Sequence, residues 1–243
     1  MYFRSLSLAR AHAIRFGCLA LALGALGACT APTGNATESV ASAESADTTL
    51  ESEVKETFVE TLGRPAQDWE VAVWVQRITS GQDTLYTMRR DFVNDAQCAS
   101  AITKVYQDTL ARTPSTSEID TWRQNIYVGW SIASMRAAFV QDPQCASAIT
   151  KVYQDALART PSAGEIDYWR SQLDGVASIA SMRANFVNDS QCVGAITEAL
   201  EVTLKLTPPI AGWIIADWQS CILAGGSIAD IYEYQDSSTC TKS

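Results

Sequence analysis

Apolar side chains recur every three to four residues along most of the chain, which is the period of an amphipathic α-helix. Over residues 97–111 they form one stripe of Cys98, Ile102, Val105, Tyr106 and Leu110. Two shorter stripes follow, the first of Ile119, Trp122 and Ile126, the second of Ile132, Met135 and Phe139. No strand-like alternation of useful length interrupts them. The pattern therefore predicts an all-α fold made of short amphipathic helices.

Polar residues and prolines between the stripes mark the ends of the predicted helices. Pro114 ends the first helix. Ser115 and Glu118 then match a capping box, in which the serine caps a new helix and the glutamate reaches back to the serine backbone. Asp142 and Pro143 fit the N-cap and the first position of the next helix. The sequence thus predicts a group of three helices, after which a new helix begins at Pro143.

The same pattern returns along the chain. The segment Ala101–Pro114 recurs almost unchanged as Ala148–Pro161. A leucine, a tryptophan and a cysteine keep their places in four copies: Leu62, Leu110, Leu157 and Leu204; Trp74, Trp122, Trp169 and Trp218; Cys98, Cys145, Cys192 and Cys240. Three short helices cannot bury their apolar faces alone, so neighbouring copies must pack together. We expect a helical array, or solenoid, of tandem three-helix repeats of about 47 residues, at 53–98, 99–145, 146–192 and 193–243, the last as a C-terminal capping unit.

The segment before the repeats has the composition of an export signal and a tether. Met1–Ala28 has a basic start and an apolar run too short to span a bilayer, which predicts a signal peptide. It ends in Leu-Gly-Ala followed by Cys29, which resembles the lipobox of bacterial lipoproteins. We expect a lipid on Cys29 to anchor the protein to a membrane. By resemblance to lipoprotein sorting, Thr30 favours the outer membrane. Residues 29–52 lack aromatic residues and apolar periodicity, so we expect a lipidated, disordered tether.

Charge and histidine content exclude several classes of function. Without the signal, 15 basic residues face 27 acidic ones, a net charge of −12 that argues against nucleic acid as a partner. The only histidine, His12, lies in the signal. The mature chain therefore has no Ser-His or Cys-His nucleophile pair and no histidine metal ligand. We expect no cofactor and no metal site.

The third unit carries a further pattern. It comprises Tyr153, Gln154, Asp155, Leu157, Arg159, Pro161, Trp169, Leu173, Gly175, Ser178 and Phe186. This pattern resembles the bacterial domain-of-unknown-function family 4214, over about residues 53–240. The resemblance implies helical repeats of exported and surface proteins, and it implies no reaction. Cysteine stands here where the family closes its unit with a bulky apolar residue. The fourth unit departs further, with Leu206 in place of the arginine.

Three units contain an acid and an arginine four residues apart on one helix face: Glu60 and Arg64, Asp108 and Arg112, Asp155 and Arg159. Both positions change together in the fourth unit, to Val202 and Leu206, so we expect the two side chains to interact. We predict a structural corner in which the guanidinium bonds backbone carbonyls at the helix end. A site for a substrate carboxylate is the alternative.

The cysteines of an exported chain can form disulfides. Cysteines at equivalent positions are a whole unit apart and make poor partners. If the first two helices of the fourth unit are antiparallel, Cys192 and Cys221 meet, so we predict that pair, with Cys221–Cys240 as the alternative. Cys98 and Cys145 are then buried small apolar residues. No CxxC spacing supports a zinc site.

Some aromatic residues do not recur with the repeat. Tyr127 and Trp130 share the loop after the second helix of the second unit, and an exposed pair there could stack on a sugar ring or anchor a protein. Trp69 and Trp213 occupy one register in the first and last units, where we expect them to plug the ends of the array.

The leading functional hypothesis is a non-enzymatic binding or scaffold module of the cell envelope for a protein or glycan partner. One alternative is a carboxylate-dependent enzyme acting on envelope polysaccharide. Glu118 and Asp120 are two residues apart on a helix and point apart, which disfavours a glycosidase-like acid and base pair. The other alternative is a purely structural spacer. We expect no catalytic residue.

Overall fold

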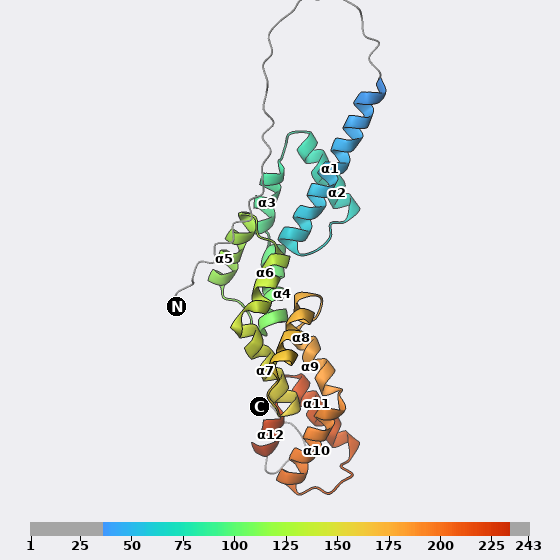
Figure 1. The fold of residues 1–243 in the computed structure, drawn as a ribbon. Helices are drawn as coiled ribbons and strands as arrows, with labels where there is room; N and C mark the ends of the chain where they lie inside the picture. Colours follow the sequence, from blue (N-terminus) through green and yellow to red (C-terminus); the bar gives the residue numbers. More distant parts are fainter. Residues whose placement is uncertain (1–35, 234–243) are drawn as a thin grey trace, which may run out of the picture. The chain divides into compact units, whose positions relative to one another are not determined.

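The computed structural model describes residues 36–233, with side chains from residue 48 onwards (Figure 1). α-Helices are the only regular elements in this range, which confirms the all-α prediction. The first six helices are α1 (Ala36–Leu62), α2 (Asp68–Thr79), α3 (Leu85–Asn94), α4 (Ala96–Leu110), α5 (Thr116–Tyr127) and α6 (Ile132–Gln141). The others are α7 (Pro143–Leu157), α8 (Ala163–Asp174), α9 (Ile179–Val187), α10 (Ser190–Leu204), α11 (Gly212–Leu223) and α12 (Ile228–Glu233). The described residues from Ser42 onwards belong to one compact unit.

The predicted capping residues begin the helices. Ser115 accepts a hydrogen bond from the Glu118 backbone at 3.3 Å, and the Glu118 carboxylate accepts one from the Ser115 backbone at 2.8 Å. The same reciprocal pair, Ser162 and Glu165, begins α8. Asp142 caps α7, with Pro143 at its first position. These local bonds satisfy backbone donors that a helix start leaves unpaired.

The prediction of a disordered tether over residues 29–52 is wrong for residues 36–52, which belong to α1. This stretch is rich in alanine and glutamate, which favour helix formation. It is also continuous with the amphipathic part of α1, where Val54, Phe58 and Leu62 are buried. Packing of that end supports the helix, and good propensity extends it. The predicted signal peptide and Cys29 lie outside the described residues.

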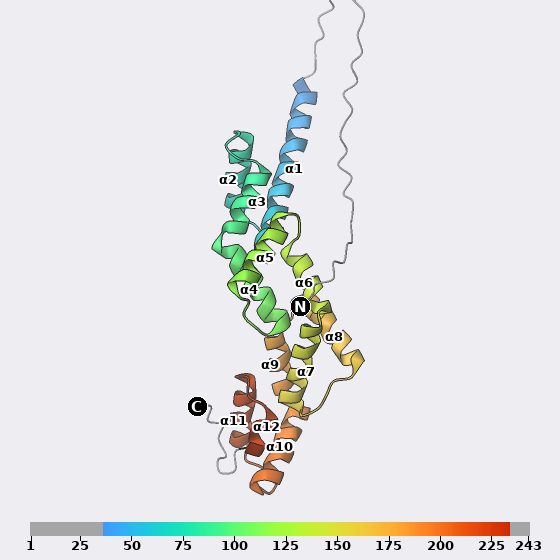
Figure 2. The ribbon, with the colours of Figure 1, turned by 90° about the vertical axis from the view of Figure 1, so that its left-hand side faces the viewer.

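Taken in threes along the chain, the described helices fall into four triplets, and the last three of these share the same internal contacts. The first and third helices of a triplet pack together, as α4 with α6, α7 with α9 and α10 with α12. The third helix also packs against the second helix of the next triplet, as α3 with α5, α6 with α8 and α9 with α11. Figure 2 shows α3 beside α5 from a second direction. Each of the helices α3, α6 and α9 therefore joins two triplets.

Aromatic rings fill the core in a recurring arrangement. In the second triplet the ring of Phe139 meets Tyr106 and Trp122 edge to face, at 4.7 and 5.3 Å between centroids. The indole nitrogen of Trp122 donates to the Tyr106 hydroxyl at 3.2 Å. The third triplet repeats this with Tyr153, Trp169 and Phe186. Edge-to-face contact between these rings stabilises the core in addition to the burial of their apolar surface. The hydrogen bond of the indole satisfies a polar group inside the core.

An arginine on the third helix links neighbouring triplets. Arg136 of α6 donates to the carboxylate of Asp108 on α4 at 2.5 Å and to the carbonyl oxygen of Leu173 in α8 at 3.0 Å. Its side chain is largely buried. The carbonyl lies in the last turn of α8, where a helix has unpaired acceptors and favours a cation. Asp108 also accepts from Lys104. We call this arrangement the arginine clamp.

The clamp occurs three times among the described helices. In the first, Arg89 joins Glu60 of α1 to the carbonyl of Ile126 in α5. In the third, Arg183 joins Asp155 of α7 to the carbonyl of Ile222 in α11. In the fourth triplet, the positions of the acid and the arginine hold Val202 and Tyr232. The two parts of the clamp are therefore lost together.

A second arginine holds the turn between the first and second helices of a triplet. Arg112 makes two bonds, of 3.1 and 2.6 Å, to the carboxylate of Glu118, the capping residue of α5. Its guanidinium lies 4.6 Å from the centre of the Tyr106 ring, and it donates to Gln144 of the next triplet at 3.2 Å. Arg64 with Glu70 and Arg159 with Glu165 form the same corner. The bidentate bond and the ring fix the guanidinium plane.

The predicted pairing of Glu60 with Arg64, Asp108 with Arg112 and Asp155 with Arg159 is wrong. The acids bond the clamp arginines Arg89, Arg136 and Arg183, and the corner arginines bond the capping glutamates. Spacing of four residues on a helix permits contact between the two side chains. The capping glutamates, however, offer the corner arginines a bidentate bond, and the clamp arginines approach the acids from another helix in a less exposed position. The predicted role of the arginines at a corner agrees with the bonds, although carboxylates rather than carbonyls are their main acceptors.

The predicted disulfide between Cys192 and Cys221 is also wrong. Cys98, Cys145 and Cys192 are free, fully buried thiols in the first turn of α4, α7 and α10. Burial raises the pKa of each thiol to about 11. The three occupy one equivalent core position, so Cys192 packs as its counterparts do. Cys221 is disulfide-bonded, and Cys240, the alternative partner, lies outside the described residues.

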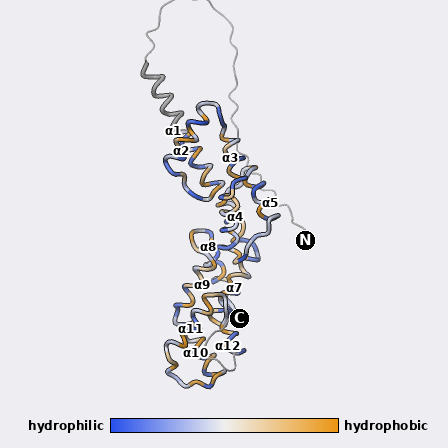
Figure 3. The backbone as a smooth tube through the Cα atoms, turned by 180° about the vertical axis from the view of Figure 1, so that it is seen from behind, coloured by the Kyte–Doolittle hydropathy of each residue, from blue (hydrophilic) through white to orange (hydrophobic). Residues whose placement is uncertain are grey.

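Hydrophobic and hydrophilic positions alternate along the helices without a long apolar run (Figure 3). Among the described residues, no helix combines the length and hydropathy that crossing a membrane requires.

Loss of a clamp arginine is expected to destabilise the fold. Arg136→Ala leaves the Asp108 carboxylate and the Leu173 carbonyl short of a donor, at a cost of about 2–3 kcal/mol in unfolding free energy. Arg136→Lys keeps the charge but not the planar fork that reaches both acceptors. It should therefore lower the unfolding free energy by most of the amount expected for Arg136→Ala. Urea titration followed by circular dichroism measures both. Lys55→Ala, which removes an exposed pair with Glu51, should change stability by no more than about 0.5 kcal/mol. Equal effects of Arg136→Ala and Lys55→Ala would contradict the clamp.

The corners are expected to make stability depend on acid pH. Hydrogen bonds from Arg112 and Arg159, the largest cause, lower the pKa of Glu118 and Glu165 from 4.5 to about 2. A lowered folded-state pKa gives stability that is fully present above the unfolded value and is lost as pH falls from about 4.5 towards 2. The double change Glu118→Gln, Glu165→Gln should therefore lower Tm at pH 7 and lose this difference near pH 2. Glu56→Gln, outside the corners, serves as control. A Tm gap that stays constant over this range would contradict the assignment.

Candidate functional site

A groove lies between α3 and α5, at the junction of the first two triplets. From α3 it is lined by Arg90, Val93 and Asn94, and from α5 by Asp120, Arg123, Gln124 and Tyr127. Its volume is about 290 Å³, close to the lower end of the range for small-molecule sites. We call it the α3–α5 groove. Most of its lining side chains carry hydrogen-bonding groups.

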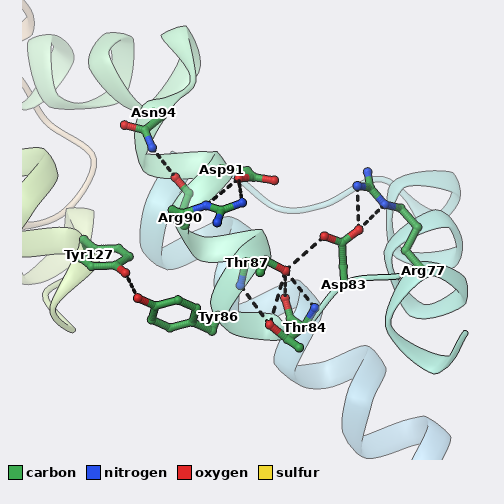
Figure 4. Close-up of polar contacts among 9 residues, drawn as sticks. All are labelled: Arg77, Asp83, Thr84, Tyr86, Thr87, Arg90, Asp91, Asn94 and Tyr127. Atoms are coloured by element: carbon green, nitrogen blue, oxygen red, sulfur yellow. Dashed lines mark hydrogen bonds and ion pairs between the residues drawn. The ribbon is translucent and has the colours of Figure 1, made fainter. Parts of the chain in front are cut away.

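Two tyrosines meet at one end of the groove. Tyr86 of α3 and Tyr127 of α5 approach through their hydroxyl groups, which are hydrogen-bonded (Figure 4). Their ring centres are 5.6 Å apart, with planes tilted by 60°. Tyr86 is 64% exposed, and Tyr127 is partly buried. The hydrogen bond with Tyr86 is the largest cause that raises the pKa of the Tyr127 hydroxyl above its usual value. The pair presents aromatic surface and hydroxyl groups to solvent.

A polar network fixes the start of α3 and thereby Tyr86. Arg77 at the end of α2 donates to the Asp83 carboxylate at 2.6 Å, and Asp83 accepts from the Thr87 hydroxyl at 3.1 Å. Thr84 and Thr87 cap the helix reciprocally. Figure 4 shows this network on the side of Tyr86 away from Tyr127. The capped helix start orients the tyrosine within the first turn.

The cations that line the groove already have anionic or carbonyl partners. Arg90 bonds Asp91 at 2.9 Å. Arg123 lies 3.6 Å from Asp120 and donates to the Asp95 carbonyl at 3.3 Å. Asn94 donates to the Arg90 carbonyl at 2.9 Å, which leaves its own amide oxygen available. The groove therefore offers polar groups of both kinds and little net charge.

The corresponding junctions of the other triplets have different residues. The position of Tyr86 holds Ala133 and Ala180, and that of Tyr127 holds Asp174. Ala137 stands where the first triplet has Arg90. The tyrosine pair is therefore specific to one junction, although the helices that carry it pack alike at the others.

Tyr127 and Trp130 do not form the predicted pair. The ring of Trp130 packs on Trp122 at 5.7 Å, while that of Tyr127 packs on Tyr86. Trp130 is 44% exposed and its carbonyl accepts from Arg89. Residues three apart on either side of a helix end face different directions, and the turn after Tyr127 separates them. The sequence signal for Tyr86 was its departure from alanine at an equivalent position.

The other candidate residues lie away from the groove. Trp69 and Trp213 are 66% and 62% exposed, so the expectation that they plug the ends is wrong. The Glu118 carboxylate forms an ion pair with Arg112. In the part of the chain that the structure describes, no three acidic, histidine or cysteine side chains gather as a metal site.

Comparisons with known proteins found no matching family model, no matching curated protein and no matching solved structure. The resemblance to family 4214 stays a prediction.

Proposed function

We propose that the protein is a non-enzymatic binding module of the bacterial cell envelope, held at a membrane by lipid on Cys29. Its triplets are tandem three-helix repeats of a helical array, and its partner is an envelope protein or glycan. The observation that carries the proposal is the exposed Tyr86–Tyr127 pair beside the α3–α5 groove.

Packing does not account for this pair. The recurring aromatic residues lie in the core and repeat with the triplets, whereas Tyr86 extends from the surface at only one junction. Alanine serves the same structural position elsewhere, so the fold does not require an aromatic ring there. Tyrosines that combine exposed apolar area with a hydroxyl are favoured at binding surfaces.

The proposed anchor rests on the sequence around Cys29. The residues Leu26, Gly27 and Ala28 precede the cysteine as in a lipobox. The acidic chain disfavours attraction to anionic headgroups, so a lipid is the simplest means of attachment.

The tyrosine pair is expected to be needed for partner binding. The full chain with Cys29→Ser is immobilised and exposed to envelope extract, and bound protein and carbohydrate are quantified. Tyr86→Ala with Tyr127→Ala should reduce specific capture by about tenfold, which corresponds to about 1.4 kcal/mol. Tyr168→Ala removes another exposed tyrosine and should leave capture unchanged. Equal capture by the wild type and the double variant would sink the proposal.

Lipid attachment predicts that Cys29→Ser moves the protein from the membrane fraction to the soluble fraction, because one acyl-bearing residue supplies the anchor. Fractionation with immunoblotting measures the distribution, and Cys98→Ser, at a buried position, controls for loss of a cysteine. A Cys29→Ser chain that still sediments with membranes would contradict the anchor.

A further inference from the structure

We propose that the α3–α5 groove binds a neutral saccharide chain, with a sugar ring stacked on Tyr127 beside Tyr86. This inference rests on the proposed binding function and names the ligand class for the same site. It combines three observations: an aromatic face, a row of free hydrogen-bonding groups, and guanidinium groups that are already paired.

The aromatic face suits a pyranose ring. The axial C–H bonds of a sugar carry partial positive charge and pack against the negative face of an aromatic ring, as edge-to-face rings do. The tilt of 60° between Tyr86 and Tyr127 gives two faces at an angle rather than one flat platform. Such a corner contacts a ring from below and from the side. The tyrosine hydroxyls at the same place are donors and acceptors for sugar hydroxyls.

The row of polar groups is supplied by both helices. Gln124 is exposed, and within the described part of the chain its side-chain amide makes no hydrogen bond. The Asp120 carboxylate is 63% exposed, and its contact of 3.6 Å with Arg123 leaves lone pairs that can accept from a second donor. The Asn94 amide oxygen is open because only its nitrogen donates. An amide, a carboxylate and an amide oxygen can together accept from and donate to neighbouring hydroxyl groups.

Charge and polarity favour a neutral sugar over an anionic one or an apolar peptide. Each guanidinium at the groove is partnered, Arg90 by Asp91 and Arg123 by Asp120, so an anionic ligand meets no unpaired cation. A peptide anchored by apolar side chains needs apolar pockets, whereas Val93 is buried and only Tyr127 offers apolar area in the lining. A groove of about 290 Å³ suits one or two sugar rings of a longer chain.

The test uses the full chain with Cys29→Ser and three neutral probes: maltotetraose, cellotetraose and chitotetraose. Saturation-transfer NMR and titration calorimetry should detect saturable binding of at least one probe, with no change in affinity at raised salt. Tyr127→Ala should weaken it by about tenfold, since one stacked ring is lost. Gln124→Ala, at an exposed position that folding does not use, should weaken it by about threefold. Tyr168→Ala should have no effect.

Two outcomes overturn the inference. One is no saturable binding of any of the three probes by the folded chain. The other is binding that Tyr127→Ala and Gln124→Ala leave unchanged, or that salt abolishes. Either result leaves the proposed function intact if capture from envelope extract still depends on Tyr86 and Tyr127 and if an excess of the probes fails to compete. Loss of that dependence would instead remove the proposed function itself.

Discussion

The arginine clamp is the interaction on which the packing of the triplets depends. Arg136 contacts an acid on its own triplet and a carbonyl at the end of a helix in the next. Apolar packing alone is roughly proportional to buried area and tolerates sliding of one helix along another. A planar guanidinium bonded to two fixed acceptors does not tolerate such sliding, because both bonds would break. The clamp therefore sets the register in which each third helix lies against the following second helix.

The same interaction positions the α3–α5 groove. Arg89 lies one turn after Tyr86 on α3, and it donates to the carbonyl of Ile126, the residue before Tyr127. A further bond to the Trp130 carbonyl holds the turn after α5. The clamp thus fixes the two helices at the point where their tyrosines meet. Because the groove is already formed by these contacts, the proposed binding would require little further ordering of the chain.

The helices and their caps could be predicted from the sequence because their signals are local. The apolar period, the Ser115 and Glu118 box and Asp142 with Pro143 all act within a few residues. The clamp could not be predicted in this way, because Arg136 meets partners 28 and 37 residues away. Spacing of four residues pointed to Arg112 as the partner of Asp108, but the structure pairs Asp108 with Arg136 on another helix.

The candidate site shows the same limit. Tyr127 could be chosen from the sequence because it departs from the pattern of its neighbours, but its partner lies on another helix, 41 residues away. Trp130 departs from the pattern too, yet it packs on Trp122 in its own triplet. Residues that differ from their equivalents in the other triplets are ones that the packing of the helices does not require. Which of them act together depends on the register between helices, and that register is set by the clamp. A residue such as Arg89 is therefore structural in its contacts and decisive for the geometry of the site, even though it does not line the groove.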